Sequence, residues 1–188
     1  MGMNVVVVQD AALSVLDECK IRHQPVASSL HVVDAAELAC GLTTQALRAG
    51  AVLLNLTSLE DLSVHAGRVS GVVVNRTTLL GALPVDPITL RCKAVIDATG
   101  HDAAAVEKLS RRGMLKNLAA LERHREGPMD ALHGEAFVVD QVAEVFPGLW
   151  VTGMSVCAVY GGPRMGPIFG GIILSGCRVA ELLLQQLK

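Results

Sequence analysis

Residues 95–102, with the sequence VIDATGHD, are the stretch that decides the fold class. The apolar run Ala94–Ala98 predicts a short strand that a Thr-Gly pair ends. Glycine lets the backbone approach a neighbouring group closely, so a strand ending in this way can pass beside a bound nucleotide. The alternative is an ordinary strand end. A helix over Asp102–Arg112 is expected to follow, with Asp102 as its cap.

The segments on either side alternate between predicted strands and helices. On the N-terminal side we expect a strand at Asn4–Val8, a helix over Gln9–Lys20, a strand at Leu30–Val33, a helix from an Asp34 N-cap to Gly50, a buried strand at Ala51–Leu56, a hairpin of Leu59–Val64 and Arg68–Asn75, and a strand at Ile88–Cys92. On the C-terminal side we expect a charged, irregular or helical segment at Leu115–Pro128, strands at Phe137–Asp140 and Leu149–Met154, a loop at Val159–Gly171 and a helix over Ile172–Leu187. This order predicts an α/β fold with a mixed sheet and an inserted β-hairpin.

Length, composition and net charge limit the classes of protein to which this chain can belong. The chain has 188 residues, enough for one domain with its own core, and 51% of them are hydrophobic. A net charge of −2 does not indicate the basic surface expected of a nucleic-acid-binding protein. No apolar stretch is long enough to span a membrane. The N-terminus carries no signal peptide pattern. Five scattered cysteines without CxxC spacing favour reduced thiols in a cytoplasmic protein.

Asp86 and His101 are the first candidates for chemistry. A carboxylate and an imidazole suit a divalent metal such as iron, but two ligands are too few, so substrate, water or a second subunit must complete the site. The alternative is that Asp86 caps a turn before Pro87 and His101 hydrogen-bonds the loop. The other histidines show no metal-ligand spacing and are expected to be surface or satisfied polar groups; they are His23, His31, His65, His124 and His133.

A second candidate is the glycine-rich segment YGGPRMGPIFGGIILSG, residues 160–176. Glycine-rich backbone before a helix can offer N–H groups and a positive dipole end to a phosphate or carboxylate. Arg164 adds a planar fork that suits the same groups. The alternative is a flexible loop with a solvated arginine.

Three segments together resemble the thiamine thiazole synthases, especially their archaeal-type branch. They are VVDAAELACGLTTQALRAGA (32–51), VDPITLRCKAVIDATGHD (85–102) and VYGGPRMGPIFGGIILSGCRVAEL (159–182). The resemblance implies a glutathione-reductase-like dinucleotide-binding fold assembled as a homo-octamer or another homo-oligomer. It also implies a transferase-type enzyme of thiamine biosynthesis, which converts NAD and glycine into an adenylated thiazole carboxylate.

The resemblance also implies roles for five residues. Asp86 and His101 match the ligands of Fe(II), in a site shared between neighbouring subunits. Arg164 matches the residue that holds the glycine-derived carboxylate. Leu59 and Met154 match positions that line the nucleotide.

Two departures from the family pattern qualify these expectations. Pro84 stands where eukaryotic members have a sulfur-donating cysteine and archaeal members commonly have a histidine, so sulfur is expected from an external source such as sulfide. The chain contains no GxGxxG, and its Met1 matches an internal methionine of the family. Residues 1–188 are therefore expected to form one domain, a partial version of the fold with exposed sheet edges. The alternative function is a catalytically inactive nucleotide-binding or subunit-interaction module.

Overall fold

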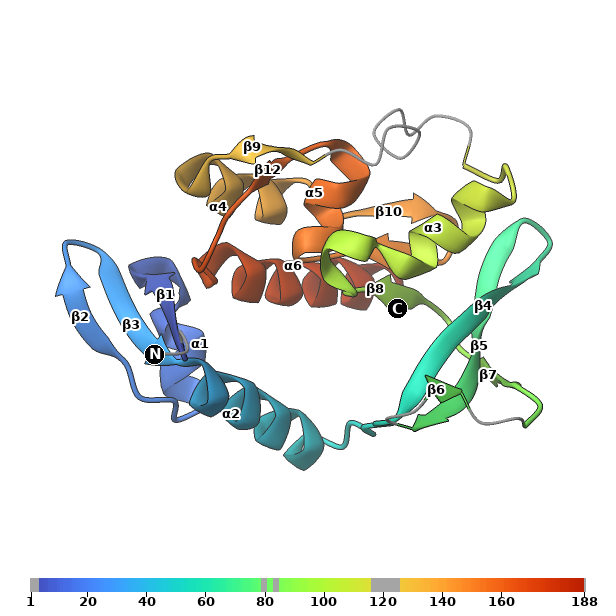
Figure 1. The fold of residues 1–188 in the computed structure, drawn as a ribbon, viewed down its shortest axis with the longest axis horizontal. Coiled ribbons are helices and arrows are strands. Elements are labelled where there is room, and N and C mark those ends of the chain that lie inside the picture. The colour runs from blue at the N-terminus through green and yellow to red at the C-terminus, as the bar shows by residue number, and fades with distance from the viewer. Residues whose placement is uncertain (1–3, 79–80, 83–84, 116–125, 188) are drawn as a thin grey trace.

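The computed structural model describes residues 4–78, 81–82, 85–115 and 126–187, and Figure 1 shows how their elements are arranged. The fold is mixed α/β with several small sheets rather than one large sheet. An N-terminal sheet and a long hairpin flank a central unit that contains the C-terminal helices (Figure 1). No helix in the described ranges is long and apolar enough to cross a membrane.

The N-terminal unit is an antiparallel sheet in the order β1-β3-β2, built from β1 (Val5–Gln9), β2 (Gln24–Ala27) and β3 (Leu30–Asp34). Between β1 and β2 lie a short 3-10 turn, η1 (Asp10–Ala12), and α1 (Leu13–Glu18). Helix α2 (Ala35–Arg48) follows β3, and its predicted N-cap is confirmed because Asp34 accepts a hydrogen bond from the Glu37 N–H at 2.8 Å.

The predicted hairpin is confirmed as β4 (Thr57–His65) and β5 (Arg68–Thr78). Its turn residues Ala66 and Gly67 both have positive φ, which matches the right-handed twist of the two strands. Two short strands, β6 (Gly81–Ala82) and β7 (Ile88–Arg91), pair with β5.

The predicted buried strand at Ala51–Leu56 is wrong. These residues are irregular and exposed, and Val52 is 82% exposed. In the described part of the chain, no strand lies beside this run to pair with its backbone, and an apolar run becomes a buried strand only when such a neighbour exists. The run therefore leaves a strip of apolar surface between α2 and the hairpin.

The central unit contains a three-stranded sheet in the order β10-β11-β8, which is mixed as predicted, although its first strand was not predicted. Strand β8 (Val95–Asp97) runs parallel to β11 (Leu149–Val151), which pairs antiparallel with β10 (Ala143–Phe146). The helices of this unit are α3 (Ala104–Arg111), α4 (Ala131–Asp140), α5 (Met154–Tyr160) and α6 (Gly170–Gln186). Two further short strands, β9 (Gly127–Met129) and β12 (Pro163–Arg164), pair in parallel.

The predicted strand at Phe137–Asp140 is also wrong, because these residues form the last turn of α4. Asp130 caps that helix by accepting a hydrogen bond from the His133 N–H at 3.1 Å. A four-residue apolar run cannot distinguish a strand from the buried end of a helix.

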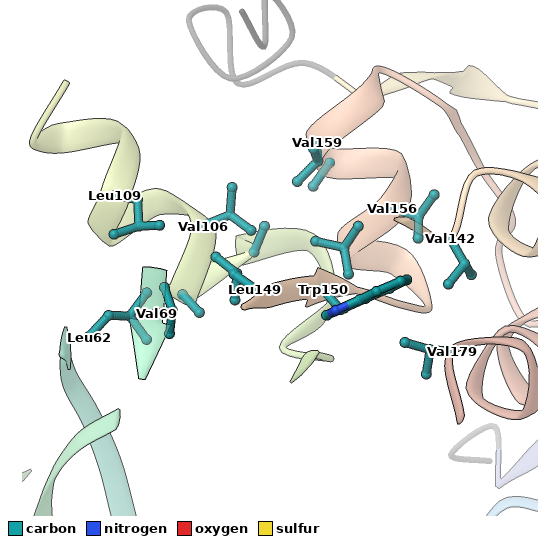
Figure 2. Packing of buried hydrophobic residues seen from close by; sticks show 14 of the residues in the cluster. Leu62, Val69, Val106, Leu109, Val142, Leu149, Trp150, Val156, Val159 and Val179 are labelled. Atoms are coloured by element: carbon teal, nitrogen blue, oxygen red, sulfur yellow. The ribbon is translucent and has the colours of Figure 1, made fainter. Parts of the chain in front are cut away.

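The main core joins the hairpin to the central unit. Figure 2 shows Leu62 and Val69 of the hairpin packed toward Leu109 of α3 and Leu149 of β11. Trp150 of β11 extends the same cluster toward the C-terminal helices (Figure 2). Full burial of each such aliphatic side chain contributes about 1.5–3 kcal/mol, so this contact fixes the hairpin against the sheet.

Candidate functional site

The buried carboxylate of Asp97 organises the backbone that follows β8. Asp97 is 1% exposed, and its Oδ2 accepts hydrogen bonds from the backbone N–H groups of Ala105 and Val106 at 2.8 and 3.0 Å. These donors belong to the first turn of α3, where N–H groups have no partner within the helix. The cap of this helix is therefore Asp97 and not Asp102, which corrects the prediction from sequence.

The other oxygen of Asp97 fixes the strand end itself. Its Oδ1 accepts from the N–H and the hydroxyl of Thr99, at 3.0 and 2.7 Å. The Ser155 hydroxyl donates to the Gly100 carbonyl oxygen at 3.0 Å and thereby ties the strand end to α5. The result is a 3-10 turn, η2 (Gly100–Asp102), in which Gly100 has a φ of 78°. This turn presents His101 at the surface.

Glu126 joins His101 to Arg164. The Glu126 side chain is only 6% exposed, and its Oε1 lies 2.6 Å from Nδ1 of His101. Its Oε2 accepts a hydrogen bond from Nε of Arg164 at 2.9 Å. Two residues predicted independently from sequence are thus held by one buried carboxylate. Glu126 was not predicted from sequence, because it lies in a charged segment with no motif around it.

Three of the five predicted site residues line one cavity of about 370 Å³. Its lining comprises His101, Met129, Met154, Arg164, Met165, Gly166, Phe169 and Ile172. Arg164 binds Glu126 through Nε, and among the described residues its two terminal nitrogens make no hydrogen bond or ion pair. A guanidinium held in this way can bind a small carboxylate.

A larger, mainly apolar cavity of about 820 Å³ shares Met154, Phe169 and Ile172 with the smaller one. Helix α2 contributes Leu38 and Leu42 to its wall, and α6 supplies much of the opposite side; the two helices are seen facing each other in Figure 1. The remaining lining residues are Val6, Val15, Ala35, Ala39, Ala98, Gly100, Thr152, Gly153, Ile173, Gly176, Cys177 and Ala180. The volume lies within the range of small-molecule sites, about 300–1,000 Å³.

Asp86 and Leu59 lie elsewhere. Asp86 is exposed, two residues before β7 on the hairpin sheet, and no hydrogen bond or ion pair connects it to His101 within the described ranges. The same residues contain no group of three or more His, Cys, Asp or Glu side chains that could hold one metal ion. Leu59 is half-buried on β4 and packs against the main core. Pro84 lies outside the described residues.

The cysteine that senses the charge of Glu126, Cys157, is a poor nucleophile. Cys157 of α5 is fully buried, and its burial, together with the negative charge of Glu126, raises the pKa of its thiol to about 11. The thiolate is the reactive form of cysteine, so Cys157 is protonated and unreactive at neutral pH. Cys40 and Cys177, both on helices, are exposed.

Comparison with known proteins identifies the family. The Thi4 family model matches residues 1–169. The thiamine thiazole synthase of Thermococcus kodakarensis is 46% identical over 188 residues, covering all of this chain and 73% of the relative's length. The thiamine thiazole synthase of Thermotoga maritima is 47% identical over 190 residues with the same coverage.

The structural comparison agrees. A crystal structure of Thermovibrio ammonificans THI4 superposes with a TM-score of 0.90 at 38% sequence identity, covering all of this chain and 73% of that one. Because the family model matches most of the chain and relatives above 40% identity cover all of it, the chain belongs to the Thi4 family, the family of the thiamine thiazole synthases.

Proposed function

We propose that this protein forms the adenylated thiazole carboxylate precursor of thiamine from NAD and glycine, with Fe(II) and an external sulfur source such as sulfide. Its relatives are named for thiazole synthesis, which supports an enzyme of thiamine thiazole biosynthesis. The observation that carries the finer proposal is the Glu126 bridge, which places His101 and Arg164 at one cavity. The transferase-type activity and the glutathione-reductase-like fold are part of this proposal.

The NAD-derived nucleotide fits the larger cavity. An adenine ring and a ribose need apolar walls with a few polar groups to orient them, and this cavity has walls of that kind. Gly153 lines it with a φ of 60°, a conformation that lets the backbone pass close to a ligand. Met154 lies where the two cavities meet and would contact both the nucleotide and the glycine-derived part.

The glycine carboxylate fits Arg164. Glu126 fixes the guanidinium through Nε, which reduces the conformational entropy that carboxylate binding would otherwise cost. The terminal nitrogens can then bind both carboxylate oxygens in parallel. Glu126 also places a negative charge beside Nε of Arg164. The guanidinium would therefore lie between two anions, the Glu126 carboxylate and the bound glycine carboxylate.

His101 and Asp86 are suited to hold Fe(II). Glu126 occupies Nδ1 of His101, so Nε2 is the nitrogen left for a metal, and a carboxylate on the other ring nitrogen is the usual support of a histidine ligand. Imidazole with carboxylate is a donor set that iron accepts. When bound, the metal would supply Lewis-acid polarisation of the glycine-derived ligand. The chain's residues orient that ligand and hold the imidazole in one tautomer.

We propose that the iron site is shared between subunits of a homo-oligomer such as an octamer. Within one chain, Asp86 lies on the hairpin sheet and His101 lies beside α5, so a second copy would bring an Asp86 to each His101. Sharing also explains why one chain offers too few ligands in its described part. We expect this assembly in the cytoplasm.

The sulfur source in this proposal is external. The thiol of Cys157, which senses the charge of Glu126, is buried and has a pKa of about 11, which makes it unfit to attack or to be transferred. Proline at position 84 has no sulfur to give. Sulfide would therefore be a co-substrate.

A complementation experiment tests the shared site. Asp86→Asn and His101→Gln are purified separately under anaerobic conditions, and each is expected to lose bound iron. Dissociation, mixing and reassembly of the two variants would create some sites with both native ligands, so iron binding and product formation should partly return. If the mixture stays as inactive as its components, while mixed wild-type protein recovers, the shared site is wrong.

A further inference from the structure

His23, which precedes β2, and His31 of β3 face each other away from the cavities described above. Nδ1 of His23 lies 3.2 Å from Nδ1 of His31, and the two rings meet at an interplanar angle of 73°. Their side chains are only 20% and 15% exposed. From sequence both were expected to be surface or satisfied polar groups without metal-ligand spacing, because the pairing of β2 with β3 that brings them together cannot be read from an eight-residue separation.

Each histidine is held by a carboxylate through its other nitrogen. Nε2 of His23 lies 3.0 Å from Oδ1 of Asp17, and Nε2 of His31 lies 2.9 Å from Oδ1 of Asp10. An ionised carboxylate only accepts hydrogen bonds, so both Nε2 atoms carry hydrogen. If both imidazoles are neutral, their Nδ1 atoms have no hydrogen, and two lone pairs face each other. A cation between them removes this repulsion.

The distances favour a metal ion as that cation. Two imidazole nitrogens bound to one tetrahedral ion at about 2.0–2.1 Å lie about 3.3 Å apart. The observed separation of 3.2 Å is close to this value, and it is at the long limit of an ordinary hydrogen bond. Two neutral histidines and two carboxylates carry a charge of −2, which a divalent ion neutralises and a proton does not.

We propose that His23 and His31 bind a divalent transition-metal ion of the zinc class through their Nδ1 atoms. Asp17 and Asp10 act as the outer carboxylates that fix the ring orientation and raise the basicity of the ligands. Water completes the coordination, because the described residues supply no third protein ligand. The ion would tie α1 and η1 to the strands β2 and β3, so it would stabilise the N-terminal sheet.

Zinc binding by full-length variants tests this site. All proteins carry His101→Gln, which removes the other imidazole proposed as a metal ligand, and all are first stripped with a chelator. Equilibrium dialysis against Zn²⁺ should give one ion per chain for the parent protein, and none at the same free concentration after His23→Gln or His31→Gln. Asp10→Asn and Asp17→Asn should each weaken binding about 10-fold or more. His65→Gln, at the exposed last residue of β4, is the matched control and should bind like the parent.

A second measurement guards against misfolding of the histidine variants. Their circular dichroism should match the parent, and the parent's thermal midpoint should rise with added Zn²⁺ while that of His31→Gln does not. The aspartate variants keep both histidines and so test the site even if the histidine variants unfold. If the parent binds no zinc, or binds it equally with and without His31, the pair shares only a proton and the metal site is wrong.

Discussion

Oε1 of Glu126 lies 2.6 Å from Nδ1 of His101, so a buried carboxylate determines which imidazole nitrogen is available to a ligand. This contact holds His101 in one tautomer even when no metal is bound. It also makes Glu126, which no motif indicated, a positioning residue of the proposed site.

Replacement of Glu126 by glutamine tests this role. Glu126→Gln keeps the shape but removes the negative charge, so His101 loses its charged support and iron affinity should fall about 10- to 100-fold. Iron retained after anaerobic gel filtration measures the effect. Glu181→Gln, at an exposed position of α6, is the matched control and should retain iron normally. Unchanged iron affinity in Glu126→Gln would show that His101 does not depend on this carboxylate.

Arg164→Lys tests recognition of the glycine carboxylate. Lysine keeps the positive charge but loses the planar fork, so kcat/KM for glycine should fall about 10- to 100-fold, the range expected for a lost charge-assisted hydrogen bond. The KM for NAD should stay close to that of the unmodified protein. Arg178→Lys, at an exposed position on α6, serves as the control. An equal loss for NAD and glycine would assign Arg164 to general folding rather than to glycine.

Asp97→Asn should destabilise the protein by about 2–4 kcal/mol. Asparagine has an NH₂ group in place of one carboxylate oxygen, so N–H groups that now donate to Asp97, such as those of Ala105 and Val106, would face a donor. Urea unfolding followed by circular dichroism measures the change. Asp102→Asn is the paired control: it removes the carboxylate that the sequence pattern favoured as cap, and it should change the unfolding free energy by less than about 0.5 kcal/mol. A larger loss for Asp102→Asn than for Asp97→Asn would contradict the capping assignment.

Glu135 predicts a pH dependence of stability. Burial raises the pKa of this α4 carboxyl above its ordinary value of 4.5, and the hydrogen bond from the Gly171 N–H offsets only part of that effect. The folded state therefore holds the proton more tightly than the unfolded state. The stabilisation is complete below pH 4.5 and is lost as pH rises through the raised pKa.

Glu135→Gln isolates this contribution, because glutamine can still accept from Gly171 but does not titrate. The unfolding free energy of the wild-type protein minus that of the variant should fall as pH rises above about 4.5 and through the raised pKa of Glu135. Denaturant titrations at several pH values measure this difference, in which the other titrating groups cancel. A difference that is constant across the range would show that Glu135 has no raised pKa.

Two glycines of α6 should respond oppositely to alanine. A Cβ at Gly171 would lie 2.9 Å from Cα of Glu135 and closer to its carbonyl oxygen, so Gly171→Ala must separate α4 from α6 and should cost about 1–3 kcal/mol or more. A Cβ at Gly176 meets nothing within 4 Å, so Gly176→Ala should stabilise the helix by about 0.5–1 kcal/mol. Thermal unfolding compares the two. Equal destabilisation by both would contradict the described packing of α4 on α6.

Local signals explain what could be predicted from sequence. The hairpin has alternating apolar residues and an Ala-Gly turn, and the start of α2 has Asp34 with Glu37 three residues later; both signals act within a few residues. The runs Ala51–Leu56 and Phe137–Asp140 could not be assigned correctly, because neighbours distant in sequence decide whether a short apolar run pairs as a strand or ends a helix.

The candidate site also combines residues that have local sequence signals with residues that only the fold brings together. His101, Arg164 and Met154 were identified from sequence through segments that resemble a family, and the structure brings them to one cavity. Glu126 is 25 residues from His101 and 38 from Arg164 in sequence, so only the fold could reveal that it binds both. The pairing of His23 with His31 depends equally on strand register.

The most direct test of the proposed function is an anaerobic reaction of the protein with NAD, isotopically labelled glycine, sulfide and Fe(II), followed by mass spectrometry of the extracted small molecules. We expect an adenylated thiazole carboxylate that contains the glycine label, and its loss when sulfide is omitted. Binding of the nucleotide without any labelled thiazole, in the presence of all four components, would contradict the proposed activity and identify an inactive nucleotide-binding module.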